Sequence, residues 1–340
     1  MKGRAGRRLR LARFWLARGD LDEAAKHAYR AQPGPPHQTV EVALTIARIE
    51  RDRDNPEASH THLLQAIAEL EAAPAGDRRD RQLVRALVDL ADCHRRAGRW
   101  AEATPLLHRA LALSGGDDCA ALTMLGIVAK ELGCFVEALD WYQQASAIQH
   151  RDGASPADRA ALRHNLAGLA YARQRYEEAE VHARQAVQLR RQARGSNEVD
   201  VAADLAVLAS AVAGQHRHDE ARAMFEQVLA VSRAARPPRR YEMAVHLHNL
   251  AALDQASGTP EAAEQRYRET LALKEELLGG EHPEVALVLN NLGTLLDEQH
   301  RTAEAAECYR RALHIVEHRL PPDHPTVEAI RRGLAGRGDH

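Results

Sequence analysis

The chain has 340 residues, of which 45% are hydrophobic and 28% are charged, so it is long enough for two ordinary domains or one long repeat array. A formal net charge of −2 excludes a molecule whose whole surface attracts nucleic acid or a membrane, and an aromatic content of 4% disfavours stacking on nucleic-acid bases. No window of the sequence approaches the roughly 18 uncharged apolar residues of a membrane-spanning helix.

The chain begins with a basic segment. Residues 1–30 carry nine Lys and Arg against three Asp and Glu. The longest apolar run in this segment, residues 14–17, is too short for the core of a secretory signal peptide. We therefore predict a basic first helix. A contact with nucleic acid or anionic lipid is the alternative, because Leu9, Phe14 and Trp15 give the segment an apolar side.

The same segment opens a pattern that recurs along the whole chain. A small residue next to a glutamate, or one position removed from it, returns at spacings of 35, 44, 35, 41, 42, 42 and 42 residues. These anchor positions are Ala24, Ser59, Ala103, Ala138, Ala179, Ala221, Ala263 and Ala305. Twelve residues before each anchor lies another small residue: Ala12, Ala47, Ala91, Gly126, Ala167, Ala209, Ala251 or Gly293.

Each copy has the spacing of two helices. In the last copy, apolar and small residues recur every three or four positions, as on one face of an α-helix, at Ala286, Leu289, Leu292, Gly293 and Leu296. A second stripe follows at Ala305, Tyr309 and Ala312, after a polar turn at residues 299–301. Small residues at the marked positions let two helices approach closely. One such hairpin cannot bury its apolar face alone, so we expect the copies to stack.

The pattern L-x-x-L-G-x-x-L…A-x-x-x-Y-x-x-A at residues 289–312 resembles the tetratricopeptide repeat (TPR), as do Trp15, Ala24 and Ala31 in the first copy. The 42-residue copies resemble the kinesin-light-chain type, whose phrase H-P-x-V-A-x-x-L-N-N-L-G occurs at residues 282–293. This resemblance implies an all-α, right-handed superhelix of about eight helix-turn-helix repeats. It also implies a concave inner surface lined by the first helix of each pair.

The copies divide the chain into four segments. Residues 1–36 are predicted to form a first hairpin with a proline-rich hinge at residues 32–36, and residues 37–155 irregular and 34–35-residue units. Residues 156–324 hold the 42-residue units, and residues 325–340 form a capping helix and tail. The copy at residues 40–72 is the weakest, because Glu50 and Ser59 replace apolar side chains there. We expect local irregularity in this region.

The face opposite the packing stripe supplies the candidate binding residues. They are His164, Asn165, Tyr171, His248, Asn249, Gln255, Asn290, Asn291 and Asp297. Asn165, Asn249 and Asn291 share one repeat position, and an amide can both donate to and accept from a peptide backbone. The resemblance implies that an asparagine at this position holds peptide backbone. The alternative is that it only orders the neighbouring helices.

The front half of the same face is mainly basic. It carries Arg10, Arg13, Arg48, Arg51, Arg95, Arg96 and Lys130 against Asp89, Asp92 and Glu131. Of these, Arg48, Arg51, Arg95 and Lys130 are the candidates for a basic groove, which would suit an acidic peptide or a C-terminal carboxylate. The alternative is a charged helix surface that is simply solvated.

Motifs for catalysis and for metals are weak. Residues 314–318 match H-x-x-E-H, an inverted zinc-protease motif, but no third ligand is evident. The H-x-H pairs point apart on a helix, and the sequence has no phosphate-binding loop or nucleophile elbow. We therefore expect no enzyme activity, no metal and no cofactor. Four cysteines without a C-x-x-C pair indicate reduced thiols and a cytoplasmic protein, and the abundance of Ala and Arg suggests a bacterial source.

The sequence therefore predicts a non-catalytic scaffold that binds a peptide segment of a partner protein in the concave groove. Nucleic acid is disfavoured as a partner. The first alternative is a regulator that responds to a peptide or other ligand. The second is a stand-alone relative of the TPR region of a multidomain signalling protein.

Overall fold

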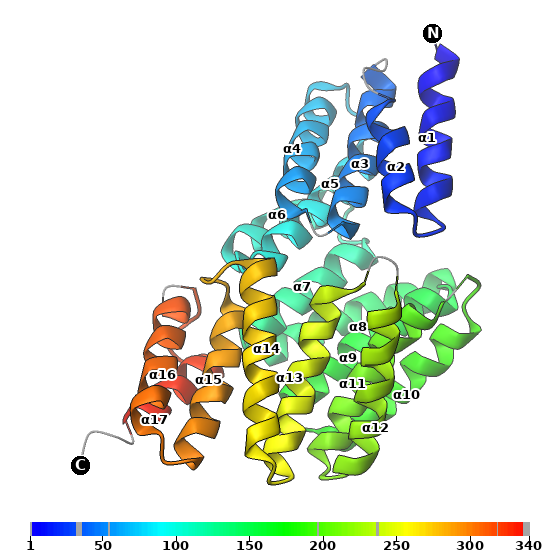
Figure 1. The fold of residues 1–340 in the computed structure, drawn as a ribbon. Coiled ribbons are helices and arrows are strands. Elements are labelled where there is room, and N and C mark those ends of the chain that lie inside the picture. Colours follow the sequence, from blue (N-terminus) through cyan, green and yellow to red (C-terminus); the bar gives the residue numbers. More distant parts are fainter. Residues whose placement is uncertain are drawn as a thin grey trace. The chain divides into compact units, whose positions relative to one another are not determined.

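The computed structural model describes residues 2–31, 36–53, 55–195, 197–235, 238–317 and 319–335, and in these ranges every regular element is an α-helix. The helices belong to two compact units, residues 1–128 and residues 129–340. The first unit (blue to cyan in Figure 1) contains α1 (Lys2–Leu16), α2 (Leu21–Tyr29), α3 (Pro36–Asp52), α4 (Pro56–Ala72), α5 (Asp77–Arg96), α6 (Trp100–Leu113) and most of α7 (Cys119–Glu131).

The second unit holds the remaining helices (Figure 1). They are α8 (Phe135–Asp152), α9 (Pro156–Ala172), α10 (Tyr176–Gln192), α11 (Glu198–Gly214), α12 (His218–Ala234), α13 (Arg240–Ala256), α14 (Pro260–Leu278), α15 (Pro283–Glu298), α16 (Thr302–Val316) and α17 (Pro325–Ala335). Most of the predicted hinge at residues 32–36 and the tail at residues 336–340 lie outside the described residues.

Consecutive helices form antiparallel hairpins that stack on one another. Within the units, α1 packs on α2, α3 on α4, α5 on α6, and so on from α9–α10 to α15–α16. In the first unit α2 also contacts α3 and α4 contacts α5, and in the second unit each helix from α8 to α16 contacts the helix that follows it, with α17 packed against both α15 and α16. The predicted all-α repeat array with a C-terminal capping helix is confirmed.

The small residues of the repeat lie at the hairpin contacts. All of the anchor alanines have an exposed fraction of 0%, and Ser59 has 1%. The six alanines located twelve positions earlier are at most 2% exposed, and Gly126 and Gly293 are buried as well. The repeat spacing therefore marks buried positions, as expected for small residues where helices pack on one another.

The turn inside most of the described hairpins contains a residue in the left-handed region. Glycine supplies it in several copies, as at Gly133 and Gly258 with φ of 78° and 74°. In three of the copies the same turn is made by Gln174, His216 and His300, with φ of 58°, 63° and 62°. The packing of the helices therefore holds the turn even where no glycine favours it.

The weak copy at residues 40–72 forms an ordinary pair, α3 and α4, so the irregularity expected there is not seen in these helices. Glu50 is 2% exposed, and its carboxylate is satisfied by three donors. Tyr29 Oη donates to Oε1 at 3.2 Å, Arg53 Nη1 to Oε1 at 3.3 Å, and Asn55 Nδ2 to Oε2 at 2.9 Å. Glu50, which departs from the repeat pattern, thus links α2, α3 and the following turn through hydrogen bonds.

The capping helix is held by an aromatic ring between two glycines. Tyr309 of α16 is 3% exposed, and a Cβ added at Gly293 of α15 would lie 3.1 Å from its ring. A Cβ added at Gly333 of α17 would lie only 2.5 Å from the same ring. Both helices therefore need a residue without a side chain where they cover Tyr309.

Gly333→Ala should loosen the capping helix, because the added methyl group clashes with the buried ring of Tyr309. We expect a loss of about 1–3 kcal/mol in the free energy of unfolding and faster hydrogen exchange of the α17 amides. The matched control is Gly168→Ala in α9, where nothing lies within 4 Å of the new Cβ. That change should stabilise the helix by about 0.5–1 kcal/mol. Equal effects at the two sites would contradict the packing of α17.

The start of α17 also returns to the beginning of the second unit. His324 Nδ1 accepts a hydrogen bond from the Thr326 N–H at 3.1 Å, so Nε2 carries the proton and donates to the Glu131 carbonyl oxygen at 3.0 Å. A Cβ added at Gly133 would lie 3.3 Å from the His324 ring and 3.4 Å from Pro325. Residues that are 193 positions apart in the sequence are therefore in contact.

Candidate functional site

Two of the three predicted asparagines present free amides. Asn165 of α9 and Asn249 of α13 occupy the same repeat position and are half-buried. Neither side chain has a hydrogen-bond partner in the part of the chain that the structure describes. Their donor and acceptor atoms are therefore available to another chain.

The third asparagine is engaged inside the protein. Asn291 Nδ2 donates to His248 Nε2 at 3.1 Å, and Asn291 Oδ1 accepts from Asn290 Nδ2 at 3.2 Å. Gln255 is also occupied, because its Nε2 donates to Glu298 at 2.8 Å and its Oε1 accepts from Tyr267 at 3.2 Å. The predicted residues of α13 and α15 thus form a polar seam between these helices.

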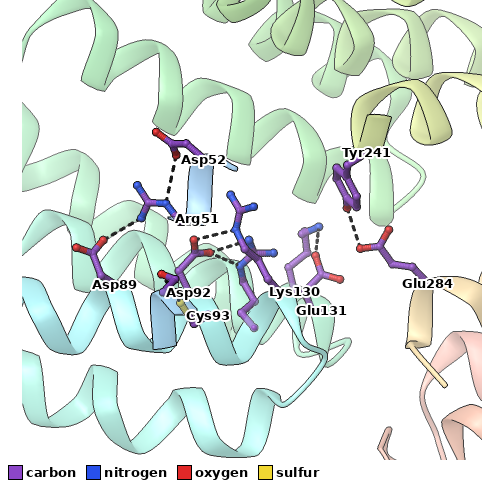
Figure 2. A network of polar contacts seen from close by, with 12 residues as sticks. Arg51, Asp52, Asp89, Asp92, Cys93, Lys130, Glu131, Tyr241 and Glu284 are labelled. Carbon is purple, nitrogen blue, oxygen red and sulfur yellow. Dashed lines mark hydrogen bonds and ion pairs between the residues drawn. The ribbon is translucent and has the colours of Figure 1, made fainter. Parts of the chain in front are cut away.

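A buried charged pair continues this seam. Lys274 of α14 is 4% exposed, and its Nζ donates to Glu284 Oε2 at 2.8 Å. The Tyr241 hydroxyl donates to the other carboxylate oxygen at 2.8 Å (Figure 2). Burial raises the pKa of Glu284, but the charge of Lys274 and its hydrogen bond outweigh burial and hold the pKa below the usual value. Burial, assisted by Lys274, lowers the pKa of His248 to about 3, so this histidine is neutral at pH 7.

His164 is held by a second buried carboxylate. Asp204 of α11 is 0% exposed and accepts from His164 Nδ1 at 2.9 Å and from Arg190 Nε at 2.9 Å. Asp204 was not among the predicted residues. The sequence signal that could have found it is its position as an acidic residue inside the mainly apolar run of residues 201–214. Tyr171 lies exposed at the end of α9, and Asp297 is half-buried near the end of α15.

Three of the four basic candidates are already paired with carboxylates. Figure 2 shows Arg51 between Asp89 and Asp52, at 3.1 and 3.6 Å. Arg95 and Arg96 both contact Asp92, at 2.7 and 3.0 Å. In the second unit, Lys130 contacts Glu131 at 2.9 Å. Arg48, by contrast, is exposed and has no ion-pair partner among the described residues.

Arg48 lines a hollow of about 410 Å³ between the first helices of the first unit. The walls come from α1, α3 and α5 and from the residue after α1: Arg13, Leu16, Ala17, Glu41, Leu44, Thr45, Arg48, Gln82 and Arg85. Sequence analysis missed Gln82 and Arg85. Their spacing of three residues, followed by Asp89 four residues later, places them on the same side of α5 as the predicted polar residues.

A larger hollow of about 710 Å³ lies elsewhere, among α12, α13 and α14. Most of its lining residues belong to the second helices α12 and α14, so it is distinct from the predicted groove. No three His, Cys, Asp or Glu side chains in the described ranges gather as a metal site requires, and His318 of the H-x-x-E-H match lies outside these ranges. None of the described helices is long and apolar enough to cross a membrane.

Stacked helical hairpins with a capping helix define the class of α-solenoid repeat proteins. Within this class, the chain belongs to the tetratricopeptide repeat family, whose model matches residues 82–151, 158–234 and 242–318. The resemblance that the sequence motifs indicated is thereby confirmed. No curated protein sequence matches the chain.

Two solved structures with a TM-score above 0.6 share the fold at low sequence identity, and a third matches this chain over a shorter part. A Rap protein complexed with competence and sporulation factor is 13% identical, with a TM-score of 0.68 over 89% of this chain and 85% of that one. NprR in complex with its cognate peptide NprX is 11% identical, with a TM-score of 0.63 over 88% and 81%. A kinesin-light-chain-like repeat protein of Podospora anserina is 20% identical, with a TM-score of 0.43 over 58% and 97%.

Proposed function

We propose that the chain is a non-catalytic interaction scaffold whose first helices α9 and α13 hold an extended peptide segment of another protein. The observation that carries the proposal is the pair of unpartnered amides at one repeat position, Asn165 and Asn249. An amide side chain matches the donor and acceptor of a peptide group whatever the peptide sequence is. Neighbouring side chains, including the exposed Tyr171, then select the sequence.

Two further findings support this proposal. The fold is shared with a Rap protein solved with competence and sporulation factor and with NprR solved with its cognate peptide. The four cysteines are all free thiols, which fits a partner in the reducing cytoplasm.

The test uses a peptide selected against the full chain from a displayed random library. Asn165→Ala/Asn249→Ala should weaken its binding by roughly tenfold or more, because each lost hydrogen bond contributes about 0.5–1.5 kcal/mol. Thermal stability should not change, since neither amide has a partner in the described chain. The matched control is Gln185→Ala/Gln188→Ala, which removes two exposed amides from the second helix α10. Unchanged affinity in the asparagine variant would remove the basis of the proposal.

The alternative is a regulator in which peptide binding changes the affinity of the chain for a second protein. The hydrogen bond between His324 and the Glu131 carbonyl favours this alternative, because α17 can move away from the start of the second unit when this one contact breaks. Hydrogen exchange in α17 that changes when the selected peptide binds would distinguish the regulator from a rigid scaffold.

A further inference from the structure

A network of four charged side chains connects the second helices α10 and α12 in the second unit. Glu180 of α10 contacts Arg217 at the start of α12 at 2.9 Å, and Arg184 lies 3.9 Å from Glu220. Arg184 also contacts Glu180, and Arg217 contacts Glu220, both at 2.5 Å. We call this network the charged quartet. Because it bridges the two helices at two points, it sets the angle between them as well as their distance.

The same quartet recurs two 42-residue units later, between α14 and α16. Glu264 contacts Arg301 at 2.6 Å, and Arg268 lies 3.8 Å from Glu304. The two contacts along the chain, Arg268 with Glu264 and Arg301 with Glu304, are both 2.7 Å long. The hydrogen bond from Arg301 lowers the pKa of Glu264, which keeps this carboxylate charged at neutral and mildly acidic pH.

The junction between α12 and α14, which lies between the two quartets, cannot form one. The residues at the four corresponding positions are Arg222, Glu226, Thr259 and Ala262. Thr259 and Ala262 carry no charge, and Glu226 has no partner among the described residues. The interruption is therefore a property of the sequence, because two of the four charges are missing.

A buried carboxylate joins the two hairpins at this junction instead. Asp254 of α13 is 2% exposed and accepts a hydrogen bond from Arg222 Nη1 of α12 at 2.7 Å. The second oxygen of Asp254 pairs with Arg266 of α14, which belongs to the same hairpin as α13. The pair of Arg222 and Asp254 thus links one hairpin to the next at a single point. A single point of contact sets a distance but leaves the angle between the hairpins free.

The hollow of about 710 Å³ opens where the quartet is missing. Glu226 and Ala262 line it, and they hold the positions that form the long contact across each quartet. Leu247 and Leu250 of α13 also line the hollow and are 2% and 1% exposed. Atoms that face a hollow lack packing contacts on that side. Packing therefore does little to hold α12 at a fixed distance from α14.

We propose that the second unit bends between α12 and α14, about the link of Arg222 with Asp254, while the two quartets hold the helices on either side. Helices α9–α12 and α13–α16 then move as two bodies, as in a hinge motion. Asn165 of α9 and Asn249 of α13 belong to different bodies, so the bending changes the distance between these two amides. The bending does not depend on peptide binding, and its test uses no peptide, so the two proposals fail separately.

The test is double electron–electron resonance on the full chain, with spin labels attached to an introduced keto amino acid so that the native cysteines remain. The label positions, all exposed, are Gln185 in α10, Gln227 in α12, Ala272 in α14 and His314 in α16. We expect the distance distribution between Gln227 and Ala272 to be roughly twofold broader than the distributions of the two flanking pairs. Equal widths for the three neighbouring pairs overturn the proposal.

A variant without one quartet tests the cause of the difference. Arg268→Gln/Arg301→Gln should broaden the distribution between α14 and α16 to about the width found between α12 and α14. The matched control is Arg175→Gln/Arg310→Gln, which removes the same charge from pairs whose partners lie three residues away along the chain. This control should leave the width unchanged. The same width in the variant and in the control would also overturn the proposal, because the quartets would then not hold the helices.

Discussion

Replacement of Glu284 by alanine is expected to lower the free energy of unfolding by about 3–5 kcal/mol, because it leaves the ammonium group of Lys274 buried without its counter-charge. Lys274 is 4% exposed, and the described structure offers its Nζ only the Glu284 carboxylate, at 2.8 Å. The Tyr241 hydroxyl loses its acceptor in the same variant. Urea denaturation at pH 7 measures the effect.

The matched control is Glu276→Ala, which breaks a neighbouring ion pair on the surface. Arg240 and Glu276 are 42% and 60% exposed, and a pair of this kind contributes only about 0–1 kcal/mol. Replacing both Lys274 and Glu284 with apolar residues should recover most of the stability, since no charge is then left buried. A loss at Glu284 no larger than that at Glu276 would contradict the burial of Lys274.

Acid should destabilise the second unit through His246. This side chain is 4% exposed and has no hydrogen-bond partner in the described chain, and burial lowers its pKa from 6.5 to about 4. The unfolded chain therefore binds a proton at a higher pH than the folded chain does. The stability that the neutral ring contributes is fully present above pH 6.5 and is lost as the pH falls from there toward 4. At pH 5 the loss amounts to about 2 kcal/mol.

His246→Leu should remove this part of the pH dependence, so that the variant loses less stability than the unaltered chain between pH 7 and pH 5. His248 acts with the same sign, and its pKa of about 3 extends the loss to lower pH. Thermal melts across this range provide the measurement, with His150→Leu at an exposed position of α8 as the control. Parallel stability curves for His246→Leu and the unaltered chain would show that the ring of His246 is not buried as neutral imidazole.

The fold was predictable because its main requirement is periodic. Each hairpin needs small residues where its helices meet, and a single sequence shows that spacing directly, from Ala24 to Ala305. The capping helix followed from the truncated last copy. The regularity of α3 and α4 was not foreseen, because the donors that satisfy Glu50 come from the preceding hairpin and from the turn after α3, and the repeat spacing marks neither.

The candidate site was predictable only in part. Periodicity places Asn165, Asn249 and Asn291 at one position, but whether each amide is free depends on the neighbouring helix. Asn291 is occupied because His248 happens to lie opposite it. The same holds for the basic residues, since Arg51 is neutralised by Asp89, which is 38 positions away, and Arg48 is not neutralised. The repeat spacing does not predict which side chains of neighbouring helices form hydrogen bonds or ion pairs with one another.

The contact of His324 with the Glu131 carbonyl changes how the second unit can come apart. In a linear array each repeat is supported only by its neighbours, so the outermost pairs fray first and melting spreads inward. In the second unit, the contact between His324 and Glu131 supports both the first and the last residues of the array. Local unfolding at either end must therefore begin by breaking this contact, and a destabilising substitution at one end of the unit also destabilises the other end.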